Sequence, residues 1–239
     1  MKTRNGFVSN SSSSSFVVVF PEEPKSPEDV KKHIFNGVDG EMSLDYYDYS
    51  LSHDEISNQV FAKCKHKATK EELTDEFMSI LYDYFYDVEK DMKNNTDKSD
   101  NFQIFIDCVH NEGLHEAQVN IVLENIEQKI KHSRKHDDNL KALAKKYGDV
   151  NLWVDKLSKE CQAEYDEVLK KHWAEDYVFD DAKEEALRKL AEDRADAFIE
   201  RHKDWWYTVM EFSDNTANEG LLEHGDIFEH VEHIKIGHH

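Results

Sequence analysis

The chain has 239 residues, of which 38% are hydrophobic and 34% are charged, and 51 acidic against 30 basic residues give a formal net charge of −21. This charge repels phosphate backbones and anionic lipids, so it argues against non-specific nucleic-acid binding and against binding to a membrane surface. Only 8 glycines and 3 prolines force turns, which favours a mostly helical chain, and 13 Phe, 10 Tyr and 4 Trp argue against general disorder.

The first 25 residues contain a serine tract followed by an apolar run. The run Phe16–Phe20 is β-branched and aromatic and predicts a buried strand, which Pro21 ends. The apolar stretches near the N-terminus are too short for a signal peptide, and no run of 18 apolar residues predicts a membrane span. Three cysteines without metal-ligand spacing favour reduced thiols, so we expect a cytoplasmic protein.

Helix-start patterns follow in chain order. Ser26-Pro27 predicts one helix, and capping boxes at Ser52–Glu55 and Thr69–Glu72 predict two more. Residues 38–51, between the first two helices, are expected to be irregular. After Thr69, apolar residues recur at steps of three and four as far as Val88, which is typical of an amphipathic helix.

The middle of the chain predicts further helices. Residues 101–109 fit either a strand or a short buried segment. Residues 116–147 have a helical apolar stripe, which the basic patch Lys131–Lys135 is expected to interrupt. Residues 152–203 are rich in strong helix formers, and we expect two helices there, divided near residues 177–181.

The two ends of the chain, in contrast, have strand patterns. Trp205–Phe212 is aromatic and β-branched, and His233–Ile236 alternates polar with apolar residues. Because a short strand is unstable alone in water, we expect the N-terminal strand to pair with the C-terminal ones. The predicted fold is α+β and mostly helical, with residues 1–25 and 204–239 forming a small β module. Residues 26–203 form a helical region, either packed on the module as one domain or separate from it.

Both ends also resemble a known group of sequences. The opening GFVSNSSSSSF and the C-terminal EFSDN and EHGDIF stretches resemble a group of mostly uncharacterised bacteriophage and bacterial proteins. In that group the serine tract also precedes an apolar strand. The resemblance covers the chain ends alone and implies no particular activity. One departure is Thr216-Ala217, where the group has an acid and a glycine after the SDN stretch.

Histidines and acids gather near the C-terminus. Imidazole and carboxylate groups together suit a divalent transition metal such as Zn, Mn, Fe or Ni, although their spacing here matches no standard ligand code. The candidate catalytic residues are Asp214, Asn215 and His224, and the candidate metal ligands are His224, Asp226, His230 and His233. Two alternatives stay open: metal-free acid–base histidines, or a solvated polar tail whose histidines form caps and hydrogen bonds.

The serine tract is a candidate ligand-binding loop. Hydroxyl and backbone N–H groups just before the predicted strand could bind a phosphate or carboxylate, beside Asp214 and His224. The tract has neither the P-loop pattern nor a nucleophilic-serine pattern. The alternative is a tract that is disordered or satisfied within the fold. The candidate ligand-binding residues are Ser9, Asn10, Ser11, Ser12 and Ser13.

Closely spaced acids in residues 164–185 form a third candidate. They could imitate a phosphate array, or they could be an ordinary solvated helix face. Four tryptophans, at positions 153, 173, 205 and 206, could anchor an interface, although tryptophan is more often in the core. The acids are Glu164, Asp166, Glu167, Glu175, Asp176, Asp180, Asp181, Glu184 and Glu185.

Two functions are compatible with these patterns. The first is an acidic, phage-type interaction protein that binds a basic surface of a host protein and modulates it, as an inhibitor or anti-defence factor. The alternative is an enzyme or ligand-binding protein that acts on a phosphate-bearing small molecule. Its site would combine the serine loop with the C-terminal Asp and His residues, with or without a divalent transition metal.

Overall fold

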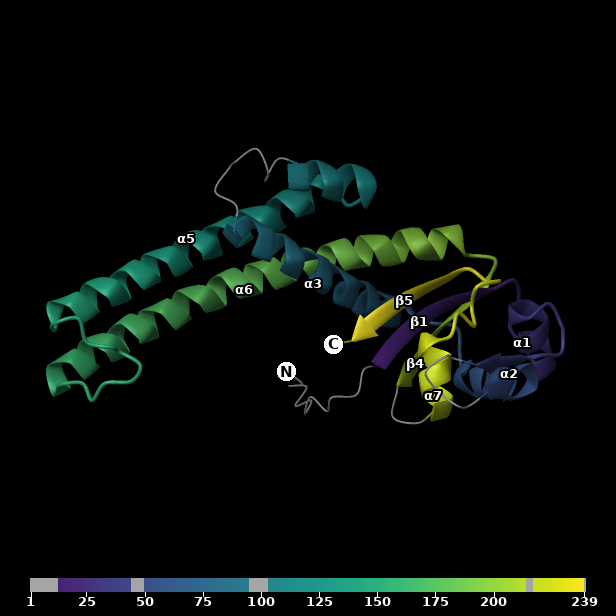
Figure 1. Ribbon diagram of the computed structural model, residues 1–239. Helices are drawn as coiled ribbons and strands as arrows, with labels where there is room; N and C mark the ends of the chain where they lie inside the picture. The colour runs from purple at the N-terminus through teal and green to yellow at the C-terminus, as the bar shows by residue number, and fades with distance from the viewer. Residues whose placement is uncertain (1–12, 44–49, 95–102, 214–216, 239) are drawn as a thin grey trace. The chain divides into compact units, whose positions relative to one another are not determined.

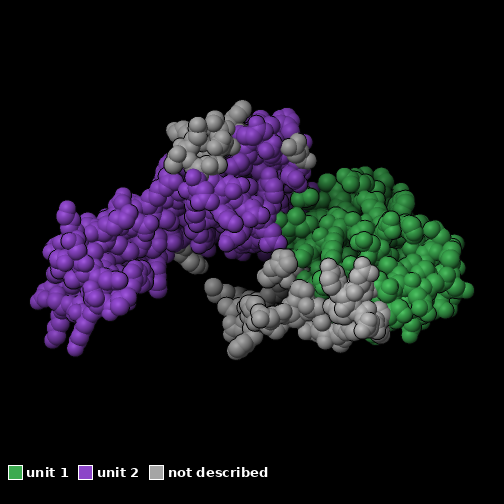
Figure 2. All heavy atoms as spheres, viewed as in Figure 1, with its two compact units in different colours: residues 1–80, 194–239 green, residues 81–193 purple. Residues whose placement is uncertain are grey.

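The computed structural model describes residues 13–43, 50–94, 103–213 and 217–238 (Figure 1). The chain divides into two compact units, which Figure 2 colours separately. Unit 1 comprises residues 1–80 and 194–239, and unit 2 comprises residues 81–193. The unit that contains both chain ends therefore includes residues 26–80 as well as the predicted β module.

Unit 1 is built on a three-stranded antiparallel sheet of order β4-β1-β5. The central strand β1 (Ser13–Phe20) pairs along its whole length with β4 (Trp206–Ser213), so that Ser13 lies opposite Ser213. Its other edge pairs with β5 (His233–His238), and Ser13 lies opposite His238 there. The two chain ends thus share one sheet, which confirms the α+β fold predicted from the sequence.

The apolar run of β1 is buried on both faces of the sheet. Phe16, Val18 and Phe20 belong to a core cluster with residues of α1 (Pro27–Ile34), α2 (His53–Lys63) and α7 (Ala217–His224). On the opposite face, Val19 lies opposite Tyr207, whose ring packs edge-on against Phe198 at 5.3 Å. A strand covered on both faces needs an unbroken apolar sequence, and FVVVF supplies it.

The helix starts in unit 1 follow the predicted local signals. Ser26 accepts a hydrogen bond from the Asp29 backbone N–H, and Ser52 and Glu55 form a complete capping box. The Thr69 hydroxyl likewise accepts from the Glu72 N–H, and Glu72 accepts from the Thr69 N–H. Each reciprocal pair satisfies backbone donors that a helix leaves open at its start.

Unit 2 contains the C-terminal part of α3 (Lys70–Asn94), a π-helical turn η1 (Asp107–Asn111), α5 (Glu116–Lys146) and most of α6 (Lys159–Arg201). Helices α5 and α6 run antiparallel and side by side (Figure 1). Their contacts show the direction: Lys129 pairs with Asp180 near one end, and Lys146 pairs with Glu164 near the other.

Several expected boundaries were wrong. The basic patch Lys131–Lys135 does not interrupt α5, and α6 is one helix where two were expected. Lysine is a good helix former, and the pair Lys131–Glu127 at one-turn spacing supports the helix at that point. Residues 103–111 are helical, so the strand alternative for that segment was wrong. The segment expected to be irregular contains the short hairpin strands β2 (Glu41–Ser43) and β3 (Ser50–Ser52).

A separate finding concerns membranes. None of the helices in the described part of the chain combines the length and the apolar composition needed to cross a bilayer.

The burial of β1 makes a stability prediction. Phe20→Ala should lower the free energy of unfolding by about 3–5 kcal/mol, because the ring is fully buried. Val38→Ala, at an exposed position in the same unit, should change it by less than about 0.5 kcal/mol. Urea unfolding followed by circular dichroism compares the two variants, and equally small effects would contradict the burial of β1.

Candidate functional site

The last serines of the tract lie inside the sheet rather than in a loop before it. Ser13, Ser14 and Ser15 are residues of β1, and the side chains of Ser14 and Ser15 are buried. The strand therefore begins three residues earlier than its apolar run, and its N-terminal end is polar. This serine end of β1 lies beside Ser213 of β4 and His238 of β5.

A buried carboxylate from α7 contacts this serine end. Glu223 is only 1% exposed, and its Oε1 accepts a 3.1 Å hydrogen bond from the Ser14 hydroxyl. Lys235 of β5 donates a 2.6 Å hydrogen bond to the backbone oxygen of Glu223. The second oxygen, Oε2, accepts no hydrogen bond from any described residue and lies 3.8 Å from Nε2 of His224. A buried carboxylate with one free oxygen is costly, so it indicates a role other than stability.

The end of α7 is fixed by a glycine. Gly225 N–H donates to the Leu221 backbone oxygen at 2.7 Å, and a Cβ atom at position 225 would lie only 2.6 Å from that same oxygen. Any other residue at this position would have to move the backbone directly after Glu223 and His224. The close turn in EHGD therefore holds both side chains at the serine end of the sheet.

The structure brings together part of the predicted site. His224 is the predicted residue that lies beside the Glu223 carboxylate, and Ser13 begins β1. Asp226, His230 and His233 are exposed, and His233 Nδ1 lies 3.1 Å from the Val231 backbone oxygen. Six predicted residues lie outside the described ranges: Ser9, Asn10, Ser11, Ser12, Asp214 and Asn215.

The metal assignment at the C-terminus stays a prediction. Among the described residues, the cluster of His, Cys, Asp or Glu with ligand atoms all within 4.8 Å is His132, His172 and Asp176. These residues belong to α5 and α6 in unit 2, and none of them was a candidate metal ligand from the sequence, where Asp176 was named only among the closely spaced acids.

A hollow of about 410 Å³ lies along β4, the edge strand that pairs with β1. Its lining includes Lys63, Lys65, His66, Ser213 and Glu219. Partial burial tends to raise the pKa of Glu219, but hydrogen bonds from Lys63 and Ser213 outweigh it and lower the pKa overall. Lys65 is exposed and has no ion-pair partner among the described residues, whereas the exposed Glu211 adds a second carboxylate to the lining beside Glu219.

The cysteines do not suit nucleophilic chemistry. Burial raises the pKa of the Cys64 thiol to about 12, and burial also raises the pKa of Cys108. A thiol with such a pKa stays protonated at neutral pH, whereas the nucleophilic form is the thiolate. Burial therefore disfavours the thiolate form at both residues.

The acids of α6 fall into two sets. Glu164 pairs with Lys146, Asp180 pairs with Lys129, and Glu175 and Asp176 lie against His132. The other set is exposed and forms no ion pair with α5 among the described residues: Asp166, Glu167, Asp181, Glu184 and Glu185. Trp173 is 69% exposed on the same helix, and Trp153 is exposed in the loop that precedes it. The expectation that tryptophans lie in the core is therefore wrong for these two and for Trp205, which is 44% exposed.

Two features were missed from the sequence, and each has a signal there. Glu223 directly follows two leucines, Leu221 and Leu222, which indicate a buried end of the short helix. His132 and His136, like His172 and Asp176, are spaced four apart and so lie on one face of each helix. The spacing of these residues in the sequence does not show that the histidine face of α5 packs against the His172 face of α6.

Comparison with known proteins adds no further assignment. No protein-family model, curated protein or solved structure matches the chain.

The environment of Glu223 makes a paired prediction. Glu223→Gln should keep or raise the free energy of unfolding, by up to about 1 kcal/mol, because it removes a buried charge and can still accept from Ser14. Ser14→Ala should lower it by about 1–3 kcal/mol, because it leaves a second carboxylate oxygen without a partner. Denaturant unfolding measures both. A Glu223→Gln variant that is less stable than Ser14→Ala would mean that the carboxylate serves the fold itself.

Proposed function

We propose that the protein is an acidic interaction protein that binds a basic surface of a partner protein through one face of α6. Trp173 carries the proposal, because its side chain is 69% exposed on that helix. Exposure of a large aromatic side chain is costly in water, whereas tryptophan is enriched among the residues that dominate binding energy at interfaces. Nothing in the described part of unit 2 covers it.

The charges around Trp173 support a basic partner. An α-helix turns about 100° per residue, so Asp166, Trp173, Asp181 and Glu184 project within about 80° of one another. We call these four residues the Trp173 face. Between Asp166 and Glu184, this side of the helix carries one cationic side chain, that of Lys170, and Arg188 follows one turn after Glu184. The net charge of −21 would also speed encounter with a positively charged partner.

The identity of the partner rests on the chain ends. Their resemblance to bacteriophage and bacterial proteins supports a host protein in the cytoplasm as the partner, and inhibition or another modulation of that protein as the role. The net negative charge of the chain also disfavours non-specific binding to nucleic acids.

A matched pair of charge reversals tests this function. The variant Asp166→Lys/Glu184→Lys should capture at least ten-fold less of a basic binding protein from bacterial lysate than the wild-type chain. The control Glu22→Lys/Glu28→Lys changes two exposed acids of unit 1 by the same charge and should capture the wild-type amount. Quantitative mass spectrometry at low and high salt measures both.

Trp173→Ala separates recognition from simple charge attraction. The substitution leaves the net charge of the protein unchanged, yet it should weaken binding to the identified partner by at least 2 kcal/mol, about 30-fold. The proposal fails if the Trp173 face variants bind normally, or if the unit 1 control loses binding equally.

A second candidate function is the binding of a phosphate-bearing small molecule at the serine end of β1. The hollow beside Ser213, with Lys65 exposed in its wall, supports it. Asp214, Asn215 and the serines before Ser13 adjoin this hollow in sequence, so they remain candidate ligand-binding residues. His224, beside the buried Glu223 carboxylate, would be the residue that moves a proton.

Titration calorimetry with inorganic pyrophosphate tests the second candidate. The wild-type chain should bind it, and Lys65→Glu should abolish the heat of binding. Lys32→Glu, an exposed reversal on α1 away from the lining, is the control and should bind as the wild type does. An absence of heat from the wild-type chain, or equal loss in both variants, would reject the site.

A further inference from the structure

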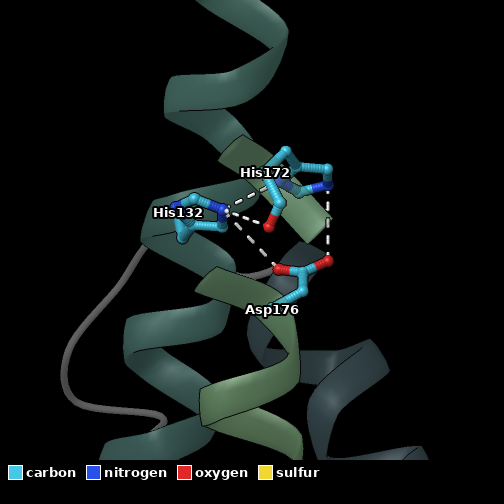
Figure 3. A group of neighbouring side chains, drawn as sticks. All are labelled: His132, His172 and Asp176. Atoms are coloured by element: carbon cyan, nitrogen blue, oxygen red, sulfur yellow. Dashed lines mark hydrogen bonds and ion pairs between the residues drawn. The ribbon is translucent and has the colours of Figure 1, made fainter. Parts of the chain in front are cut away.

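A polar cluster joins α5 and α6 in the middle of unit 2. His132 of α5 faces His172 and Asp176 of α6, and all three point toward one another (Figure 3). Their side chains are only 11%, 15% and 26% exposed. Clusters of this kind are either closed hydrogen-bond networks or sites for a cation, and the atoms that face each other distinguish the two.

The two ring nitrogens of His132 have different neighbours. Its Nδ1 lies 2.9 Å from Oε2 of Glu175, which is a hydrogen-bond distance with Nδ1–H as donor. The neutral ring then has a lone pair on Nε2. A carboxylate that holds one ring nitrogen of a histidine and turns the other toward a metal is the usual outer-shell arrangement of metal sites.

Several polar atoms of α6 converge on Nε2 of His132, which also lies 3.3 Å from the backbone oxygen of His172 (Figure 3). Nε2 of His132 lies 2.8 Å from Nδ1 of His172 and 3.7 Å from Oδ1 of Asp176. Nε2 of His172 lies 3.3 Å from Oδ2 of Asp176. Two ligands on a tetrahedral ion with bonds of about 2.0–2.1 Å are about 3.3 Å apart. Each residue can offer one ligand atom to an ion, and such a set of one atom each from His132, His172 and Asp176 lies within 4.8 Å of one another.

An unsatisfied atom gives a second, independent indication. Oδ1 of Asp176 is buried and accepts no hydrogen bond from any described residue. A buried carboxylate oxygen without a donor is costly unless a cation occupies the position it faces. By contrast, the buried His202 of unit 1 has both ring nitrogens within 3.0 Å of an oxygen acceptor, as a purely structural histidine should.

The cluster also has room for one more ligand. His136 lies one turn after His132, and its ring stacks on that of His172 with centroids 3.8 Å apart. A small cavity of about 60 Å³ is lined by His132, His136, His172 and Glu175, among others. This space would hold a water molecule or the imidazole of His136 as a fourth ligand.

We propose that His132, His172 and Asp176 form a binding site for one divalent transition-metal ion, which joins α5 to α6. Two imidazoles and one carboxylate favour Zn²⁺ and the similar ions Co²⁺, Fe²⁺ and Ni²⁺ over Mg²⁺ or Ca²⁺, which prefer all-oxygen ligands. Glu175 is a positioning residue that orients His132. The site is separate from both proposed functions and from the C-terminal histidines.

Metal titration of the full, tag-free chain tests the site. After treatment with EDTA and dialysis, the protein should bind one equivalent of Co²⁺, with a visible absorption band, and Zn²⁺ should displace that band. His172→Gln and Asp176→Asn should each weaken binding at least ten-fold. Glu175→Gln, which removes no ligand, should weaken it about 10–100-fold. Circular dichroism shows that each variant is folded.

The C-terminal histidines provide the control. The triple variant His224→Ala/His230→Ala/His233→Ala should still bind one equivalent with unchanged affinity. If the triple variant loses the metal while His172→Gln and Asp176→Asn retain it, the ion binds at the C-terminus and the proposal is overturned. Failure of the wild-type chain to bind Co²⁺ or Zn²⁺ at all also overturns it, and would identify the cluster as a proton-sharing network.

Discussion

The burial of β1 on both faces is the constraint on which unit 1 depends. Phe16–Phe20 has no exposed face, so the strand requires a neighbour on each edge and a layer on each side. β4 and β5 from the C-terminal part of the chain supply the edges, and α1, α2 and α7 cover one face. Because the register is fixed along eight residues of β4, the polar serine end of β1 must lie beside Ser213.

In this position the serine end of β1 contacts a carboxylate, which the sequence of the tract alone does not indicate. Ser14 is on the same face as Phe16, so its hydroxyl points toward α7 and finds the Glu223 carboxylate. A residue of the tract is therefore bonded to a residue of the EHGDIF stretch. The two ends of the chain are therefore in direct contact within one core.

Local signals in the sequence were sufficient for the three-stranded sheet and for the starts of α1, α2 and α3, but not for β2 and β3. The β-branched run of β1 and the capping residues Ser26, Ser52 and Thr69 act over a few residues, so they can be read directly. The continuity of α6 could not be predicted from local signals. Aromatic and acidic residues near position 180 weaken the local helix propensity, whereas packing on α5 maintains the helix.

The sites were harder to predict than the fold, for a physical reason. His132 and His172 are 40 residues apart, and their contact depends on the exact register of two antiparallel helices. Similarly, nothing local distinguishes the buried Glu223 from the exposed His224 that follows it. The C-terminal histidines were conspicuous because they are close in sequence, which is a weaker criterion than proximity in space.

The central feature of unit 1 is β1, the middle strand that pairs with both C-terminal strands and so joins the two ends of the chain. Hydrogen exchange of backbone amides, followed by NMR on the full chain, measures this position. The account predicts that the amides of Val17–Phe20 are among the slowest in unit 1 and exchange only when the unit unfolds globally. Exchange of these amides as fast as that of exposed loop residues would contradict it.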